Sequence, residues 1–394
     1  MIPELRRAYN AAYTDEKYRA YRERLVATAG CPVDFRVAES PIFLPSPFRA
    51  ALIRSTEEIL AQLQTPRHQR YSLGAVPAEF DVPGCDEHPL FAQVDFAVTR
   101  VDGALVPRLI ELQGFPSLYG FQVLQALELR RMVPAGAGLS FLLSDLDLDS
   151  YRRVLGDVIL GGYPPEHVVL FDLDPPSQKT YPDFAMTEKL WGIRAVCPTT
   201  VEKRGRELWY RRDEKATRIL RIYNRVIVDE LQAKTVELPF RYTDPLDVEW
   251  AGHPNWYFRW SKHSLPWLDH PAVPKAVFLS DLERYPRDLE HWVLKPLFSF
   301  AGVGVKVDVT AADLDAVPPS RRGQALLMQK VDYAPVIETA DGNRSKCEVR
   351  IMVVWRDDTP LPVTTLVRLS QGKMMGVDFN KDRTWVGSST SLWP

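Results

Sequence analysis

The spacing of apolar residues changes from helical to alternating within the first third of the chain. Apolar residues recur every three or four positions over residues 3–28 and 48–65, which predicts two helices. The apolar face of the second helix is formed by Leu52, Ile59, Leu60 and Leu63. Strict alternation follows over residues 91–99 and 105–112, with a Val-Asp-Gly turn between them. We therefore expect a β-hairpin that carries acidic side chains.

The central part of the chain alternates between short apolar runs and helical patterns. The runs predict buried parallel strands at residues 140–144 and 167–171, and another strand at 194–197. Helices are predicted over residues 118–133, 149–160 and 179–192. This order of elements is typical of a small α/β domain.

The last part of the chain is rich in strand-like segments. A helical stretch with several tryptophans begins near residue 246 and leads to an apolar strand that ends at Lys295. Further strands are predicted at residues 326–331, 348–355 and 363–369. We expect three units: the helices and the hairpin in 1–135, the small α/β domain in 136–245, and a strand-rich part in 246–394.

Composition excludes several classes of protein. The 394 residues carry a net charge of -2, which argues against a whole-protein attraction to nucleic acid or anionic lipid. The charged start does not resemble a secretory signal, and no apolar run has the length of a membrane helix. Four cysteines are scattered without a CxxC pair, as in a protein with reduced thiols. A cytoplasmic protein is therefore expected.

A glycine-containing loop follows the strand that carries Lys295. This loop contains Ser299, Gly302 and Gly304, and a second strand comes after it. Glycines let a backbone turn and aim its N–H groups at phosphate oxygens, and Lys295 would add a positive charge. The segment is not a P-loop, because the GKS or GKT signature is missing. A plain glycine hairpin is the alternative interpretation.

Two further segments extend this candidate phosphate site to a whole nucleotide. Upstream, Lys262 precedes the glycine loop, although a lone lysine is usually solvated. Downstream, an apolar strand ends in Gln329, Lys330 and Val331, whose backbone could hydrogen-bond adenine. A plain core strand would show the same pattern.

The predicted hairpin supplies candidate ligands for a magnesium ion. Asp95 lies on its first strand, and Glu111 and Gln113 lie two positions apart on its second strand, so this pair shares one face. Magnesium bound to a nucleotide prefers such oxygen ligands. A polar cross-strand face exposed to water is the competing interpretation.

Other polar residues could contribute to the same site. His263 could touch phosphate, Glu348 and Arg350 could form a salt-bridged pair near the nucleotide, and Asp378 and Asn380 could face the phosphates. A packing role, a plain strand pair and a polar turn are the respective alternatives. A possible lining of an acceptor pocket, or else an amphipathic element, is formed by Asn224, Arg225, Asp229 and Glu230.

Taken together, these segments resemble the ATP-grasp superfamily, in particular its permuted branch that includes glutathionylspermidine synthetase. The family has Arg-x-Asp, a hairpin and Glu-x-Asn, where this chain has Gln93-Val-Asp95 and then Glu111-Leu-Gln113. The family lysine before Leu-Pro is similar to Lys262, and its Ala-Lys-Pro with a glycine loop is similar to Leu294-Lys295-Pro296 and the residues that follow. Its late arginine is similar to Arg368.

The resemblance implies an α/β (α+β) fold of ATP-grasp type, in which two α+β units hold the nucleotide beside a small α/β substrate domain. It also implies ATP and Mg²⁺ as cofactors, with Arg368 and Gln93 at catalytic positions. The expected activity is amide formation from a small carboxylate and an amine through an acyl-phosphate. A non-catalytic or diverged ATP-binding protein, a phosphotransferase and an interaction scaffold are the alternatives. Nucleic acid and membrane are not expected partners, and a homodimer is one option for the oligomeric state.

Overall fold

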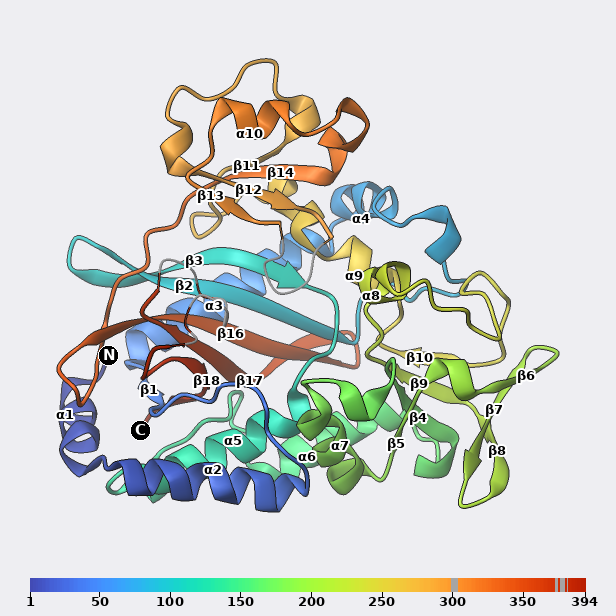
Figure 1. The fold of residues 1–394 in the computed structure, drawn as a ribbon, viewed down its shortest axis with the longest axis horizontal. Helices are drawn as coiled ribbons and strands as arrows, with labels where there is room; N and C mark the ends of the chain where they lie inside the picture. The colour runs from blue at the N-terminus through green and yellow to red at the C-terminus, as the bar shows by residue number, and fades with distance from the viewer. Residues whose placement is uncertain (299–303, 373–374, 376–379, 381) are drawn as a thin grey trace.

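A long antiparallel sheet forms the centre of the protein in the computed structural model, which describes residues 1–298, 304–372, 375, 380 and 382–394. Its strands follow the order β18-β17-β16-β2-β3 (Figure 1), and the short β15 also pairs with β16. Their bounds are β2 Phe91–Val101, β3 Ala104–Gln113, β15 Ile337–Glu338, β16 Arg344–Arg356, β17 Thr359–Ser370 and β18 Gly387–Ser389. The predicted hairpin and the strands predicted at 348–355 and 363–369 are thereby confirmed. The hairpin pairs with β16, which comes from the other end of the chain.

Helices cover this sheet because its strands are apolar on both faces over part of their length. On one face, α3 (Ser46–Leu63) packs against β3, β16 and β17 and buries Leu52 and Ile59 with Val349. On the other side lie α2 (Asp15–Ala29), α5 (Tyr119–Met132), α6 (Leu148–Leu160) and α7 (Tyr181–Trp191), below the sheet in Figure 1. A short parallel pair, β1 (Ile42–Phe43) with β19 (Ser391–Leu392), joins the two ends of the chain.

A small parallel sheet lies mostly within residues 136–245, where a small α/β domain is expected, and the division of the chain into three units stays a prediction. Its order is β10-β9-β4-β5, with bounds β10 Glu249–Ala251, β9 Arg221–Asn224, β4 Val168–Phe171 and β5 Arg194–Val196. The antiparallel strands β6 (Glu202–Arg204), β7 (Glu207–Arg212) and β8 (Lys215–Ile219) extend from it, and helix α8 (Val228–Ala233) follows β9. The predicted strands at 167–171 and 194–197 are confirmed.

A second small sheet lies beyond β3, at the top of Figure 1. It is antiparallel in the order β11-β14-β12-β13, with bounds β11 Ala276–Phe278, β12 Trp292–Pro296, β13 Lys306–Val307 and β14 Ala325–Gln329. Helix α10 (Ala311–Asp315) covers it, and Leu294, Leu314 and Leu327 share its own apolar core. The large and small sheets together match the predicted α+β architecture.

Three predicted elements differ from the structure. The helix expected over 3–28 is divided into α1 (Pro3–Ala12) and α2, because Thr14 adopts an extended backbone and caps α2 by accepting a hydrogen bond from the Lys17 N–H. Residues 140–144 form only single bridges, one of Ser140 to Trp393 and one of Leu142 to Thr364, and no strand. The tryptophan-rich stretch that leads to β12 forms β10, the short α9 (Asn255–Arg259), β11 and three 3-10 segments instead of a long helix.

The remaining helix, α4 (Pro66–Leu73), packs beside α3 and α9. Within the described part of the chain, no helix has both the length and the apolar character required to cross a membrane.

Candidate functional site

One face of the large sheet carries a polar cluster, and the strand register explains why. Asp95 lies opposite Glu111 on β3 and opposite Arg350 on β16, and directly opposed residues point to the same face. Glu348 lies opposite Arg368 on β17 in the same way. Gln93 and Gln113, two positions before Asp95 and two after Glu111, are also paired and share this face. The cluster therefore takes residues from four adjacent strands.

Asp95 is completely buried and is held by two guanidinium groups. Arg350 donates from Nε to Oδ1 at 2.5 Å and from one Nη to Oδ2 at 2.6 Å, and Arg368 donates to Oδ2 at 2.8 Å. Burial alone would raise the pKa of Asp95, but the two arginines outweigh it and hold the pKa below its usual value. Asp95 is thus a carboxylate with both oxygens engaged.

Arg368 connects Asp95 to a second buried carboxylate, Glu348. It lies 3.2 Å from Glu348 Oε1, while the Tyr333 hydroxyl donates to Oε2 at 2.8 Å. Burial raises the pKa of Glu348, because the attraction of Arg368 does not fully compensate the loss of solvation and Asp95 adds repulsion. Arg368 keeps about a third of its side chain exposed, so it is the arginine of this pair that can reach a ligand.

Lys295 reaches the same face from β12 of the small sheet. Its Nζ donates to the carbonyl oxygen of Ile110 at 3.0 Å, and the hairpin register passes over Ile110, since Asp95 pairs with Glu111 and the next residue pairs with Leu109. Burial lowers the pKa of Lys295 to about 8, with Glu111 opposing and Lys262 assisting the shift. Lys262 is also buried, and its Nζ lies 3.5 Å from the carbonyl oxygen of Leu297. Lys295 therefore lies close to Glu111, one of the predicted carboxylates, and to Lys262.

The predicted magnesium ligands surround the guanidinium group of Arg350. Arg350 engages both oxygens of Asp95, lies 3.9 Å from Glu111 and lies 2.8 Å from the Gln113 amide oxygen when that amide is oriented toward it. No group of three or more His, Cys, Asp or Glu side chains suited to a metal occurs among the described residues. These residues, as arranged, do not fit the predicted metal site, and no step proposed below depends on magnesium.

The predicted nucleotide residues are only partly brought together. Gln329 ends β14, exchanges hydrogen bonds with the backbone of Lys275 and is exposed, whereas Lys330 pairs with Asp308 at 3.1 Å. Val331 is half-buried just after them. Gly304 has a φ of +75° and lies against Pro296. Ser299 and Gly302 lie outside the described residues, and adenine binding at this strand end stays a prediction.

Other candidates have different partners from those expected. Glu348 and Arg350 do not form the predicted pair, because each has a closer partner on a neighbouring strand. Asn380 accepts hydrogen bonds from the backbone after β17, and Asp378 lies outside the described residues. His263 is largely buried, with its ring near Phe278.

The four residues considered for an acceptor pocket also have partners within the protein. Arg225 pairs with Asp183, Asn224 accepts a hydrogen bond from the Val226 N–H, and Asp229 accepts one from the Tyr257 hydroxyl. Glu230 contacts Gln178 and Lys234. An acceptor pocket at these residues stays a prediction.

Two members of the cluster were missed or misassigned from the sequence. Tyr333 lies in the segment that leads from the small sheet to β16, and only that path brings its hydroxyl to Glu348. Arg350 was linked to the wrong carboxylate. Its alternation with apolar residues on β16 marked it as a buried charge in need of a partner, but could not identify Asp95.

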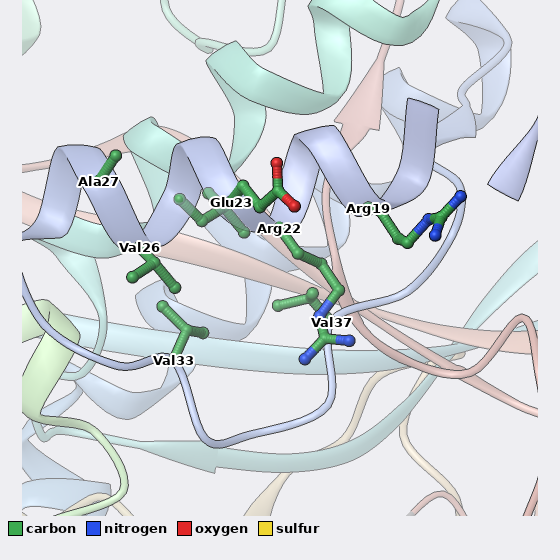
Figure 2. A pocket seen from close by; sticks show the side chains of 8 residues that line it. Arg19, Arg22, Glu23, Val26, Ala27, Val33 and Val37 are labelled. Atoms are coloured by element: carbon green, nitrogen blue, oxygen red, sulfur yellow. The ribbon is translucent and has the colours of Figure 1, made fainter. Parts of the chain in front are cut away.

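A separate surface hollow of about 380 Å³ lies between α2 and the segment after it (Figure 2). Its lining combines Arg19 and Arg22 with the apolar Val26, Val33 and Val37. It contains none of the predicted site residues, so the polar cluster on the sheet is the better candidate.

A comparison with solved structures supports the fold. The chain is similar to a glutathione synthetase-like effector from Globodera pallida, solved in its apo form, with a TM-score of 0.61 and 13% sequence identity. The alignment covers 96% of each chain. No protein-family model matches the sequence, and no curated protein matches it. The glutathione synthetase-like, ATP-grasp-like fold is thereby shown, and at this identity the likeness is limited to the fold.

Proposed function

We propose that this chain, which shares its fold with a glutathione synthetase-like protein, is an ATP-dependent ligase that joins a carboxylate to an amine. The observation that carries the proposal is the contact of Lys295 with the edge of the large sheet at Ile110, with Glu111 and Lys262 close to its ammonium group. Two buried lysines and the partly exposed Arg368 offer three positive charges at one place. Such a set suits the phosphates of a nucleotide held between the two sheets.

The proposed reaction has two steps. A carboxylate oxygen of the acid attacks the γ-phosphorus of ATP, the bond to the bridging oxygen breaks, and ADP leaves with an acyl-phosphate as the other product. The amine then attacks the acyl carbon, the carbon–oxygen bond to phosphate breaks, and the amine loses a proton. Lys295 and Arg368 neutralise charge on the transferring group, and the protein chiefly positions the reactants.

Product analysis tests the proposal directly. The purified chain is incubated with ATP and panels of acids and amines, and ADP release is measured with hydroxylamine present. ADP release that depends on the acid, with a hydroxamate as product, supports a ligase because hydroxylamine traps an acyl-phosphate. Release with a stable phosphorylated product would indicate a phosphotransferase instead.

One observation favours a second candidate, a nucleotide-binding protein without turnover. The carboxylate of Asp95 is neutralised by Arg350 and Arg368, so it has no oxygen free for a reacting ligand in this arrangement. ATP binding without ADP release under any substrate pair would select this candidate.

A further inference from the structure

The guanidinium of Arg350 lies among the side chains that were predicted to bind a metal ion. Its three nitrogens donate to Asp95 Oδ1, Asp95 Oδ2 and Gln93 Oε1 at 2.5, 2.6 and 2.6 Å. The Gln113 amide oxygen, oriented toward it, lies at 2.8 Å and Glu111 at 3.9 Å. A guanidinium has five N–H donors in a fixed plane, and here they face oxygens from four side chains.

A magnesium ion in this place would compete with Arg350 for the same atoms. Magnesium requires oxygen ligands at about 2.0–2.1 Å in octahedral geometry. Both oxygens of Asp95 already accept hydrogen bonds from nitrogen donors. The ion would also lie beside a buried like charge, because Arg350 has only 8% of its side chain exposed.

The balance of charges in the cluster also argues against a bound metal ion. Four cationic side chains, Lys262, Lys295, Arg350 and Arg368, meet three carboxylates, those of Asp95, Glu111 and Glu348. Arg350 and Arg368 neutralise the most deeply buried carboxylate, Asp95. The half-buried Glu111 is the carboxylate that most strongly favours the charged form of Lys295. The cluster can then accept an anion without an added cation.

We infer that Arg350 is a built-in cation that replaces the divalent metal, and that this site binds nucleotide phosphates in the absence of magnesium. The inference rests on the nucleotide site proposed above and specifies how that site balances the charge of its ligand. Arg350 acts as a positioning residue through Asp95, while Lys295 and Arg368 contact the phosphates.

Calorimetric titration with a non-hydrolysable ATP analogue tests the inference in two buffers, one with magnesium and one with EDTA. We expect the two dissociation constants to differ by less than about tenfold, or about 1.4 kcal/mol. A dissociation constant at least about tenfold weaker in EDTA would overturn the inference and leave the nucleotide site intact. Absence of binding in both buffers would overturn the proposed function as well.

Two variants separate the charge of Arg350 from a general structural role. Arg350→Met removes the guanidinium and leaves Asp95 with Arg368 as its one remaining arginine partner, so binding should become dependent on magnesium. Arg350→Lys keeps a positive charge and should bind in EDTA more tightly than the Met variant. Thermal unfolding of both variants shows whether each is folded, and equal binding of the two folded variants in EDTA would contradict the assigned role.

Discussion

Lys295 donates a hydrogen bond to the carbonyl oxygen of Ile110 at 3.0 Å, and this contact joins two sheets whose strands lie 185 residues apart in the sequence. Ile110 immediately precedes Glu111, and the hairpin register passes over it at this point. An ammonium group and a carboxylate are therefore held together where the small sheet meets the large one. This is the geometry on which the proposed phosphate site depends.

The pKa of Lys295 predicts how nucleotide binding varies with pH. Burial lowers this pKa to about 8, so the free protein carries an ammonium group below that pH and a neutral amine above it. Only the ammonium attracts phosphate, so affinity should fall as pH rises through this value. We expect a loss of about tenfold between about pH 7 and pH 9, measured by titration with an ATP analogue.

Lys295→Arg is the matched control for this prediction, because a guanidinium remains charged over the same range. Its affinity should vary little with pH, whatever its value near neutrality. The assignment would be wrong if the wild type and the Arg variant lost affinity in parallel, because another titrating group would then be responsible.

The polar cluster shows which parts of a site can be predicted from sequence. Period-two alternation and a Val-Asp-Gly turn were sufficient to predict the hairpin, and with it the shared position of Asp95 and Glu111. The partner of Asp95 could not be predicted, since Arg350 is 255 residues away and only the register between β2 and β16 brings them together. Long-range register therefore limited the prediction.

Short apolar runs limit the prediction of strands from sequence in a second way. Residues 140–144 and 168–171 have similar composition, yet only the second run pairs on both sides within a sheet. The first lies beside the C-terminal segment and β17, where it makes single bridges. Composition predicts burial for both runs, whereas strand formation depends on neighbours supplied by other parts of the chain.

Arg368 is predicted to contribute to turnover through its positive charge. In the proposed reaction, loss of one preorganised donor to the transferring group costs about 10²–10³ in rate, so Arg368→Met should lose that much ADP release. Arg368→Lys keeps the positive charge but loses the planar guanidinium, so its rate should lie between those of the wild type and the Met variant. Unchanged turnover in a folded Met variant would remove Arg368 from the reaction.

Asp183 is predicted to be essential for stability, because its side chain caps helix α5 although Asp183 itself lies in α7. Its buried carboxylate accepts hydrogen bonds from the N–H groups of Leu118, Gly120 and Phe121 at the start of α5, and pairs with buried Arg225. Removing one partner of a buried ion pair costs about 3–5 kcal/mol, so Asp183→Ala should lower the free energy of unfolding by that amount.

Urea denaturation of Asp183→Ala beside Asp213→Ala checks this prediction. Asp213 also pairs with an arginine, Arg194, but it is largely exposed, and exposed pairs contribute about 0–1 kcal/mol. Similar losses in the two variants would contradict the structural role given to Asp183.

Gly387 is predicted to tolerate no side chain, because two separate constraints act on it. It begins β18 with a φ of +112°, and a Cβ at this position would overlap the carbonyl oxygen of Arg36. The dihedral alone costs a residue other than glycine about 1–3 kcal/mol, and the backbone contact adds to it. Gly342 also has a positive φ, of +83°, but a Cβ there would meet no described atom within 4 Å. Gly387→Ala should therefore lose more stability than Gly342→Ala in the same denaturation experiment, and equal losses would show that β18 can move away from Arg36.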